Sequence, residues 1–98
     1  MSDLHSEAAD QLFDAILALE DREECYRFFE DLCTITELQA MSQRFHVAQL
    51  LRRGLVYNEV GRLSGASSAT ISRVNRSLQY GNGGYEIAFG RLKEESGE

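Results

Sequence analysis

The segment from Ser67 to Leu78 carries arginines and small hydroxylated residues at a spacing that gathers them on one side of a helix. Residues three, four and seven positions apart share a helix face. That face lacks acidic residues and consists of Ala69, Ser72, Arg73 and Arg76, with Ser68 and Thr70 beside them near its N-terminal end. Arginine pairs with phosphate or, bidentately, with guanine. Small residues near a helix N-terminus, which itself favours an anion, allow close approach to phosphates and base edges. The pattern is typical of a helix that lies in a nucleic-acid groove.

A shorter helix and a tight turn must hold this face in place. The apolar positions that would pack the two helices together are Val60, Leu63, Ile71, Val74 and Leu78. Gly61 falls where the helices would cross, and Gly65 follows the first helix, where a left-handed backbone costs glycine least. Ser67 or Ser68 can cap the second helix by accepting from its free N–H groups. We therefore predict a helix-turn-helix over residues 57–79.

Double-stranded DNA is the partner that this geometry predicts. The residues expected to contact it are Arg62, Ser67, Ser68, Ala69, Thr70, Ser72, Arg73 and Arg76. A solvated helix face would normally mix charges of both signs. The alternative of a different class is a protein–protein adaptor that uses the helix-turn-helix scaffold without binding DNA. Retention on duplex DNA that falls steeply with salt distinguishes the two.

The chain is acidic as a whole, with a net charge of −6, but its charge is divided unevenly. Residues 38–80 contain six arginines against Glu59 alone, a net charge of +5. Residues 1–37 carry −9 and residues 81–98 carry −2. The basic charge is therefore concentrated where a nucleic acid would dock.

Helical periodicity recurs along most of the 98 residues, and the chain contains no proline. We expect one all-α domain of six helices, in which residues 1–55 dimerise, 57–79 form the helix-turn-helix and 80–98 hold a glycine break and a C-terminal helix. The first helix is predicted over 4–19 and the last over 86–95.

Two helix starts carry capping-box patterns, in which a short polar residue and an acid or amide three positions later satisfy each other's backbone N–H groups. Asp21 with Glu24 predicts the start of the second helix, and Thr36 with Gln39 predicts the start of the third. Gly54 is expected to end the third helix.

Two of these helices are apolar over more than one narrow stripe, and a domain of this size cannot cover all of that surface internally. We therefore predict a homodimer, with helices of two chains interleaved.

Other chemistries find no support in the residues. Cys25 and Cys33 would lie roughly 12 Å apart on a helix, too far for a disulfide. No cluster has metal-ligand spacing, and neither His5 nor His46 has a nucleophile and an acid suitably placed for catalysis. We expect no metal, no cofactor and no enzymatic activity. No apolar run is long enough to cross a bilayer and no signal peptide is evident, so a cytoplasmic protein without a membrane partner is expected.

Two stretches together resemble a known family. They are "TITELQAMSQRFHVAQLLRRG" (34–54) and "YNEVGRLSGASSATISRVNRSLQYGNGGY" (57–85), of which "GASSATISRV" and "YGNGGY" are the most specific parts. They resemble the tryptophan repressor family, and most closely its Trp-repressor-like YerC/YecD branch. The resemblance implies an intertwined all-helical dimer that binds operator DNA as a repressor, with one recognition helix in each subunit.

The resemblance also implies a ligand pocket, whose residues would be Thr34, Arg44, Arg73 and Ser77. The family places a glycine directly after the recognition-helix arginine, and the indole of tryptophan packs against that bare backbone. This chain has Val74 there, and Val56 stands where the family has a capping serine. Two methyl groups would project where the ring should lie. We therefore predict that tryptophan is not sensed, and the sequence identifies no other effector.

Overall fold

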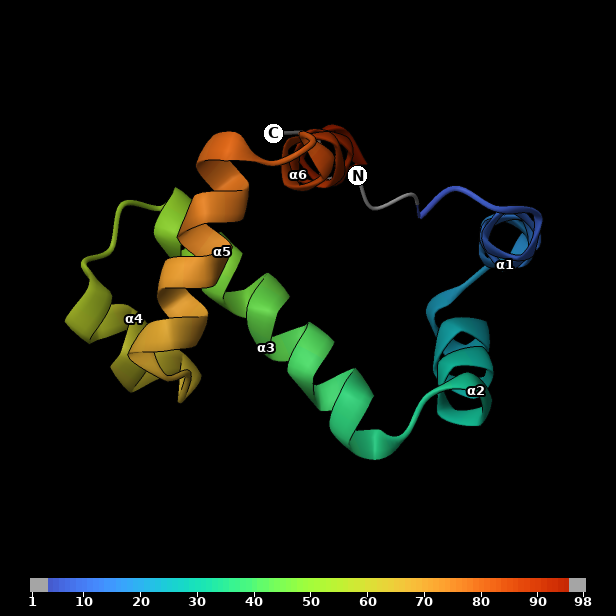
Figure 1. Ribbon diagram of the computed structural model, residues 1–98, viewed down its shortest axis with the longest axis horizontal. Coiled ribbons are helices and arrows are strands. Elements are labelled where there is room, and N and C mark those ends of the chain that lie inside the picture. Colours follow the sequence, from blue (N-terminus) through green and yellow to red (C-terminus); the bar gives the residue numbers. More distant parts are fainter. Residues whose placement is uncertain (1–3, 96–98) are drawn as a thin grey trace. The chain divides into compact units, whose positions relative to one another are not determined.

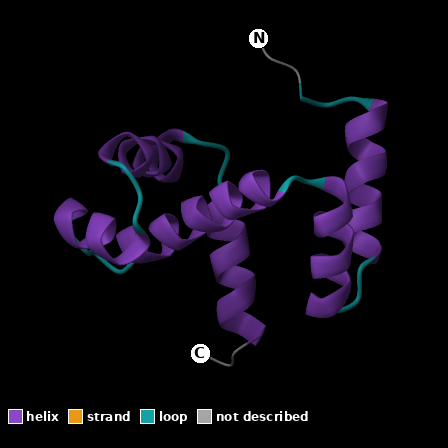
Figure 2. Ribbon diagram, turned by 90° about the horizontal axis from the view of Figure 1, so that it is seen from below, coloured by secondary structure: helices purple, strands orange, loops and turns teal. Residues whose placement is uncertain are grey.

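The computed structural model describes residues 4–95, and every regular secondary-structure element within that range is an α-helix. The six helices are α1 (Glu7–Ala18), α2 (Arg22–Leu32), α3 (Ile35–Arg52), α4 (Tyr57–Ser64), α5 (Ser68–Tyr80) and α6 (Gly84–Glu95), shown in Figure 1 and, from a second direction, in Figure 2. The predicted fold class is confirmed. The chain consists of two compact units: the first unit ends at Leu38, and the second unit begins at Gln39.

In the first unit, side-chain caps fix the helix starts. The hydroxyl of Ser6 accepts from the N–H of Ala9 at 3.0 Å, so α1 begins three residues later than predicted. The Asp21 carboxylate accepts from the N–H of Glu24 at 2.8 Å, as expected. The Glu24 carboxylate reaches back to the N–H of Glu20, also at 2.8 Å, one residue further than a capping box requires.

The start of α3 was predicted wrongly. The hydroxyl of Thr34 accepts from the N–H of Glu37 at 3.0 Å, and the Glu37 carboxylate accepts from the N–H of Thr34 at 2.8 Å. Thr34 with Glu37 therefore forms the capping box, in place of Thr36 with Gln39. A carboxylate outcompetes a neutral amide here because its hydrogen bond is charge-assisted and the helix N-terminus favours a negative charge.

The end of α3 agrees with the prediction. The helix ends at Arg52, and the N–H of Gly54 donates to the carbonyl of Leu51 at 2.9 Å. The N–H of Leu55 then donates to the carbonyl of Leu50 at 3.3 Å. This pair of bonds is a Schellman motif, which satisfies the last carbonyls of a helix and turns the chain away from its axis.

The second unit contains the buried core. Its members come from three helices and are Val47, Ala48, Leu50, Val60, Ile71 and Val74, each at most 3% exposed. Around them pack Leu51, Leu55, Ala66, Leu78, Tyr85 and Phe89. The predicted apolar sides of α4 and α5 are thus confirmed at four positions. Leu63 is the exception, since it is 45% exposed.

The aromatic residues of α6 attach that helix to α3. Phe45 lies 6.3 Å from Tyr85 and 5.3 Å from Phe89, measured between ring centroids. The guanidinium of Arg52 lies 5.2 Å from the Phe89 centroid and pairs with Glu86. Because Tyr85 takes part in this packing, α6 begins at Gly84, two residues earlier than predicted.

Gly81 ends α5 for a steric reason. A Cβ at this position would lie 2.5 Å from the carbonyl oxygen of Ser77, which is closer than real Cβ atoms approach. The N–H of Gly81 donates to the same carbonyl at 3.0 Å. Only a residue without a side chain therefore fits at the C-terminal end of α5.

Within residues 4–38 of the first unit, no large apolar side chain is buried. Neither α1 nor α2 contains a buried residue, and Leu4, Leu17 and Ile35 are 81%, 81% and 75% exposed. The sequence predicted such a surplus of apolar surface, and the fold shows it on the helices expected to dimerise.

Candidate nucleic-acid interface

The turn between α4 and α5 has the geometry that the sequence predicted. Gly65 adopts a left-handed conformation with φ of +74°, and its N–H donates to the carbonyl of Gly61 at 2.9 Å. Ser67, and not Ser68, caps α5 by accepting from the N–H of Thr70 at 3.2 Å. The start of α4 has no such cap, because Val56 offers no side-chain acceptor.

Gly61 lies at the crossing of the two helices, as expected, but close approach does not depend on its missing side chain. A methyl group there would lie 3.7 Å from both the Ala66 carbonyl and the Ile71 Cδ1 atom. That distance is an ordinary van der Waals contact, so alanine would also fit.

The predicted DNA-facing residues form an accessible surface on α5. Of the seven that belong to α5 and its cap, six are exposed: Ser67, Ser68, Ala69, Ser72, Arg73 and Arg76. Thr70 differs, since it is half-buried and its hydroxyl accepts from the Ser67 hydroxyl at 3.2 Å. Thr70 and Ser67 therefore support the start of the helix, while the other residues of the surface remain available for contact.

Arg62 differs from the two arginines of α5 in its ion pairing. Arg62 forms an ion pair with Glu59 on its own helix. The hydrogen bond from the Arg62 guanidinium, together with its charge, lowers the pKa of the Glu59 carboxyl, and the same pair raises the pKa of Arg62. The pair therefore persists above the usual pKa of glutamate and is lost only as pH falls through the lowered value. In the described part of the chain, Arg73 and Arg76 have no acidic partner.

A second polar residue in the turn was not predicted. The Ser64 hydroxyl donates to the carbonyl of Val60 at 2.7 Å and accepts from the N–H of Ala66 at 3.1 Å. The Ser64 carbonyl accepts from the side-chain amide of Gln43, on α3, at 3.3 Å. The two bonds of the Ser64 hydroxyl could have been predicted, because a serine directly precedes the glycine that ends α4. No local pattern signals the third, because its partners are 21 residues apart.

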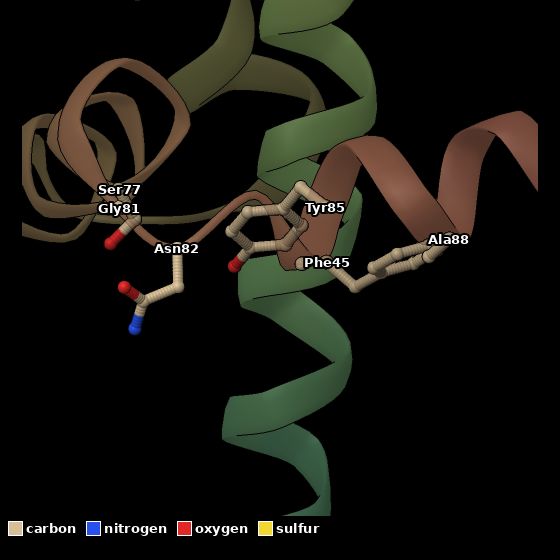
Figure 3. A pocket seen from close by; sticks show the side chains of 7 residues that line it. Phe45, Ser77, Gly81, Asn82, Tyr85 and Ala88 are labelled. Carbon is tan, nitrogen blue, oxygen red and sulfur yellow. The ribbon is translucent and has the colours of Figure 1, made fainter.

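One of the four residues of the expected ligand pocket, Ser77, borders a cavity in the structure. Ser77 lines an open pocket of about 490 Å³ whose other lining residues are Phe45, Gly81, Asn82, Gly84, Tyr85 and Ala88 (Figure 3). Neither Arg44 nor Arg73 lines it, and the Thr34 hydroxyl is engaged in the cap of α3. The pocket therefore presents aromatic, hydroxyl and amide groups, and no charge.

Metal sites, disulfides and membrane spans were also considered over residues 4–95. Within them no group of His, Cys, Asp or Glu could hold a metal ion, and both cysteines are free thiols. None of the helices described has the length and apolar character needed to span a bilayer.

Comparisons with known proteins extend the family resemblance beyond residues 34–85. The model of the family described as Trp repressor protein matches residues 7–93. The uncharacterized protein YerC of Bacillus subtilis is 55% identical over 95 residues, which cover 97% of this chain and 91% of YerC.

Two crystal structures share both sequence and fold with this chain. The structure of a candidate Trp repressor from Staphylococcus aureus is 54% identical, with a TM-score of 0.89 over 92% of this chain and 90% of that one. A TrpR-like protein from Eubacterium eligens is 56% identical, with a TM-score of 0.88 over 91% of this chain and 92% of that one. The similarity thus includes the N-terminal helices, where the sequence alone showed only a matching pattern.

Because Arg62 is paired with Glu59 and Arg76 has no acidic partner in the described structure, the two arginines should affect the salt dependence of DNA binding differently. Replacing Arg76 with alanine should flatten the dependence of log affinity for duplex DNA on log salt by about one unit, if its guanidinium contacts a phosphate. Arg62→Ala is the matched control and should change the slope less, because Glu59 already offsets that charge. Fluorescence anisotropy across a salt series measures both slopes. Equal slopes for the Arg76 variant and the unmodified protein would place Arg76 away from the phosphates.

Proposed function

Because the chain belongs to the Trp repressor family, we propose that it is a sequence-specific DNA-binding regulator of transcription that acts as a repressor. The observation that carries the proposal is the acid-free, exposed face of α5, with two arginines that lack acidic partners in the described structure. The helix behind that face is held by a cap, a left-handed turn and a buried core. Such a face suits the major groove of B-DNA, which admits one α-helix.

We assign different roles to the small residues and to the arginines of this face. Ser68, Ala69 and Ser72 are small and exposed, so they allow the N-terminal half of α5 to come close to base edges. Arg73 and Arg76 lie further along the helix and supply contacts to phosphate or guanine. Net charge supports the same assignment, because the acidic residues are concentrated in the first 37 positions, outside this face.

A test of this face is Ala69→Glu. The substitution places bulk and negative charge on the exposed side of α5 and leaves Ile71 and Val74 buried. We expect it to abolish binding to duplexes selected from random sequence by the unmodified protein, without a loss of helical structure. Gln11→Glu, which adds the same charge on the exposed surface of α1, is the control and should bind normally.

Retained affinity in a folded Ala69→Glu protein would show that another surface meets DNA. Failure of the unmodified protein to enrich any duplex, or binding indifferent to salt, would favour the protein–protein adaptor.

We further propose that the functional unit is a homodimer with interleaved helices. The apolar side chains left exposed on α1 and at the start of α3 support this assembly, since solvent would otherwise cover Leu17 and Ile35 almost entirely. Two recognition helices in such a dimer would lie about one DNA turn apart, roughly 34 Å.

Sedimentation equilibrium tests the assembly. We expect a species of twice the 11.1 kDa chain mass at micromolar concentration. Leu17→Asp should weaken association, because it places a charge in the proposed interface, whereas Asp14→Asn on the same helix should not. A folded monomer of the unmodified protein at micromolar concentration would contradict the prediction.

We also propose that the protein does not respond to tryptophan. Val74 is 1% exposed and belongs to the buried core, so the backbone of α5 is not bare at that position. A ring placed against it would have to displace core side chains. Overpacking of this kind typically costs about 1–3 kcal/mol, which corresponds to roughly a tenfold to hundredfold loss of affinity.

Calorimetry tests this proposal. L-tryptophan at millimolar concentration should give no measurable binding and leave DNA affinity unchanged. Val74→Gly should partly restore binding and should cost roughly a few tenths of a kcal/mol of stability from helix propensity, plus the lost burial. Asn75→Gly is a control that lowers propensity at the neighbouring position without opening the core. Micromolar binding by the unmodified protein would return Thr34, Arg44, Arg73 and Ser77 to ligand-binding roles.

A further inference from the structure

The helix-turn-helix receives a side-chain hydrogen bond from outside its own sequence. The amide nitrogen of Gln43, on α3, donates to the carbonyl of Ser64, the last residue of α4, at 3.3 Å. The bond is partly buried, and Gln43 itself is half-buried. It therefore connects α3 directly to the turn that leads into α5.

Ser64 makes contacts with both sides of that turn. Its hydroxyl bridges the Val60 carbonyl in the last turn of α4 and the N–H of Ala66 in the connection to α5. With its carbonyl held by Gln43, this one residue links α3, α4 and the start of the connection. Ser64 lies three residues before Ser67, which caps α5.

The space beside the turn is also occupied by Gln43. A Cβ placed on Gly65 would lie 4.0 Å from the Gln43 amide nitrogen, so the side chain reaches over the left-handed residue as well as its neighbour. The amide thus contacts the turn where the chain changes direction between the two helices.

A directional bond at this place has a different effect from the apolar core. Ile71 and Val74 hold α5 against α3 and α4 through contacts that depend weakly on direction. A hydrogen bond weakens steeply away from linearity and so restricts rotation of the turn. Specific docking in a groove depends on that orientation more than non-specific attraction to phosphates does.

We propose that Gln43 is a positioning residue, which fixes the turn through Ser64 and thereby sets the orientation of α5 for specific DNA recognition. This inference rests on the proposed function. Gln43 acts through the turn and contributes no DNA contact of its own.

The test compares Gln43→Met, which keeps the length of the side chain but removes the donor, with Gln49→Met, the same change at another half-buried position of α3. Each protein is measured for thermal stability, for affinity to a selected duplex and to a scrambled duplex, and for the salt slope. A net hydrogen bond of ordinary strength predicts that Gln43→Met loses roughly fivefold to tenfold in affinity for the selected duplex. Affinity for the scrambled duplex and the salt slope should stay unchanged, and Gln49→Met should behave like the unmodified protein.

A second measurement does not depend on DNA. Amide hydrogen exchange at Gly65 and Ala66 should be faster in Gln43→Met than in Gln49→Met, relative to exchange at the buried positions of α5. Gln43→Asn, whose amide is too short to reach Ser64, should show the same change if the methionine variant folds poorly.

The outcomes are distinct. Unchanged selectivity between the two duplexes in the Gln43 variants overturns the inference. A parallel loss of both affinities with a flatter salt slope also overturns it, because Gln43 would then contact phosphate itself. If the unmodified protein binds no duplex, the proposed function fails, and unchanged exchange at Gly65 and Ala66 would separately exclude a role for Gln43 in holding the turn.

Discussion

The burial of α4 and α5 against the C-terminal half of α3 is the interaction on which the rest of the structure depends. Among the residues whose burial the structure describes, all those that are at least 97% buried belong to these three helices. Since small domains bury a limited share of their surface, the six apolar residues of this core supply much of the driving force for folding of the second unit. The candidate interface is thus built on the best-packed part of the described chain, which suits a surface whose orientation must be reproducible.

The same helical period that forms the core also separates it from the basic face. Ile71 and Val74 lie three positions apart and are buried, whereas Ala69, Arg73 and Arg76 fall on the other side of α5 and are exposed. Because the acidic residues lie mainly in the first unit, the chain can have a net charge of −6 and still present a positive surface. Net charge affects the solubility of the whole molecule, whereas the local arrangement of charged side chains on α5 decides what this helix can bind.

Much of this arrangement could be predicted from the sequence, because it depends on local rules. Helical periodicity identified Val60, Ile71 and Val74 as core residues, and glycine chemistry identified the turn at Gly65. The cap at Thr34 was missed because Thr34 with Glu37 and Thr36 with Gln39 both fit the capping-box pattern. The sequence does not show which of the two threonines precedes the helix as its cap. The bond from Gln43 to Ser64 was missed because it joins distant positions, and the clash that requires Gly81 depends on the exact end of α5.

Val74 connects the core to the question of regulation. A repressor controlled by a small molecule needs a recognition helix with two accessible orientations, and the ligand can shift them only by its difference in affinity. A buried valine in place of a glycine stabilises the packed helix without a ligand, by roughly a few tenths of a kcal/mol of helix propensity together with burial of apolar surface that stabilises by roughly 25 cal/mol per Å². That stabilisation is present at all times, because the valine is covalently part of the helix. On the proposed function, the core of the second unit therefore supplies permanently what a bound ligand would supply conditionally, and α5 is held ready for DNA by its own packing.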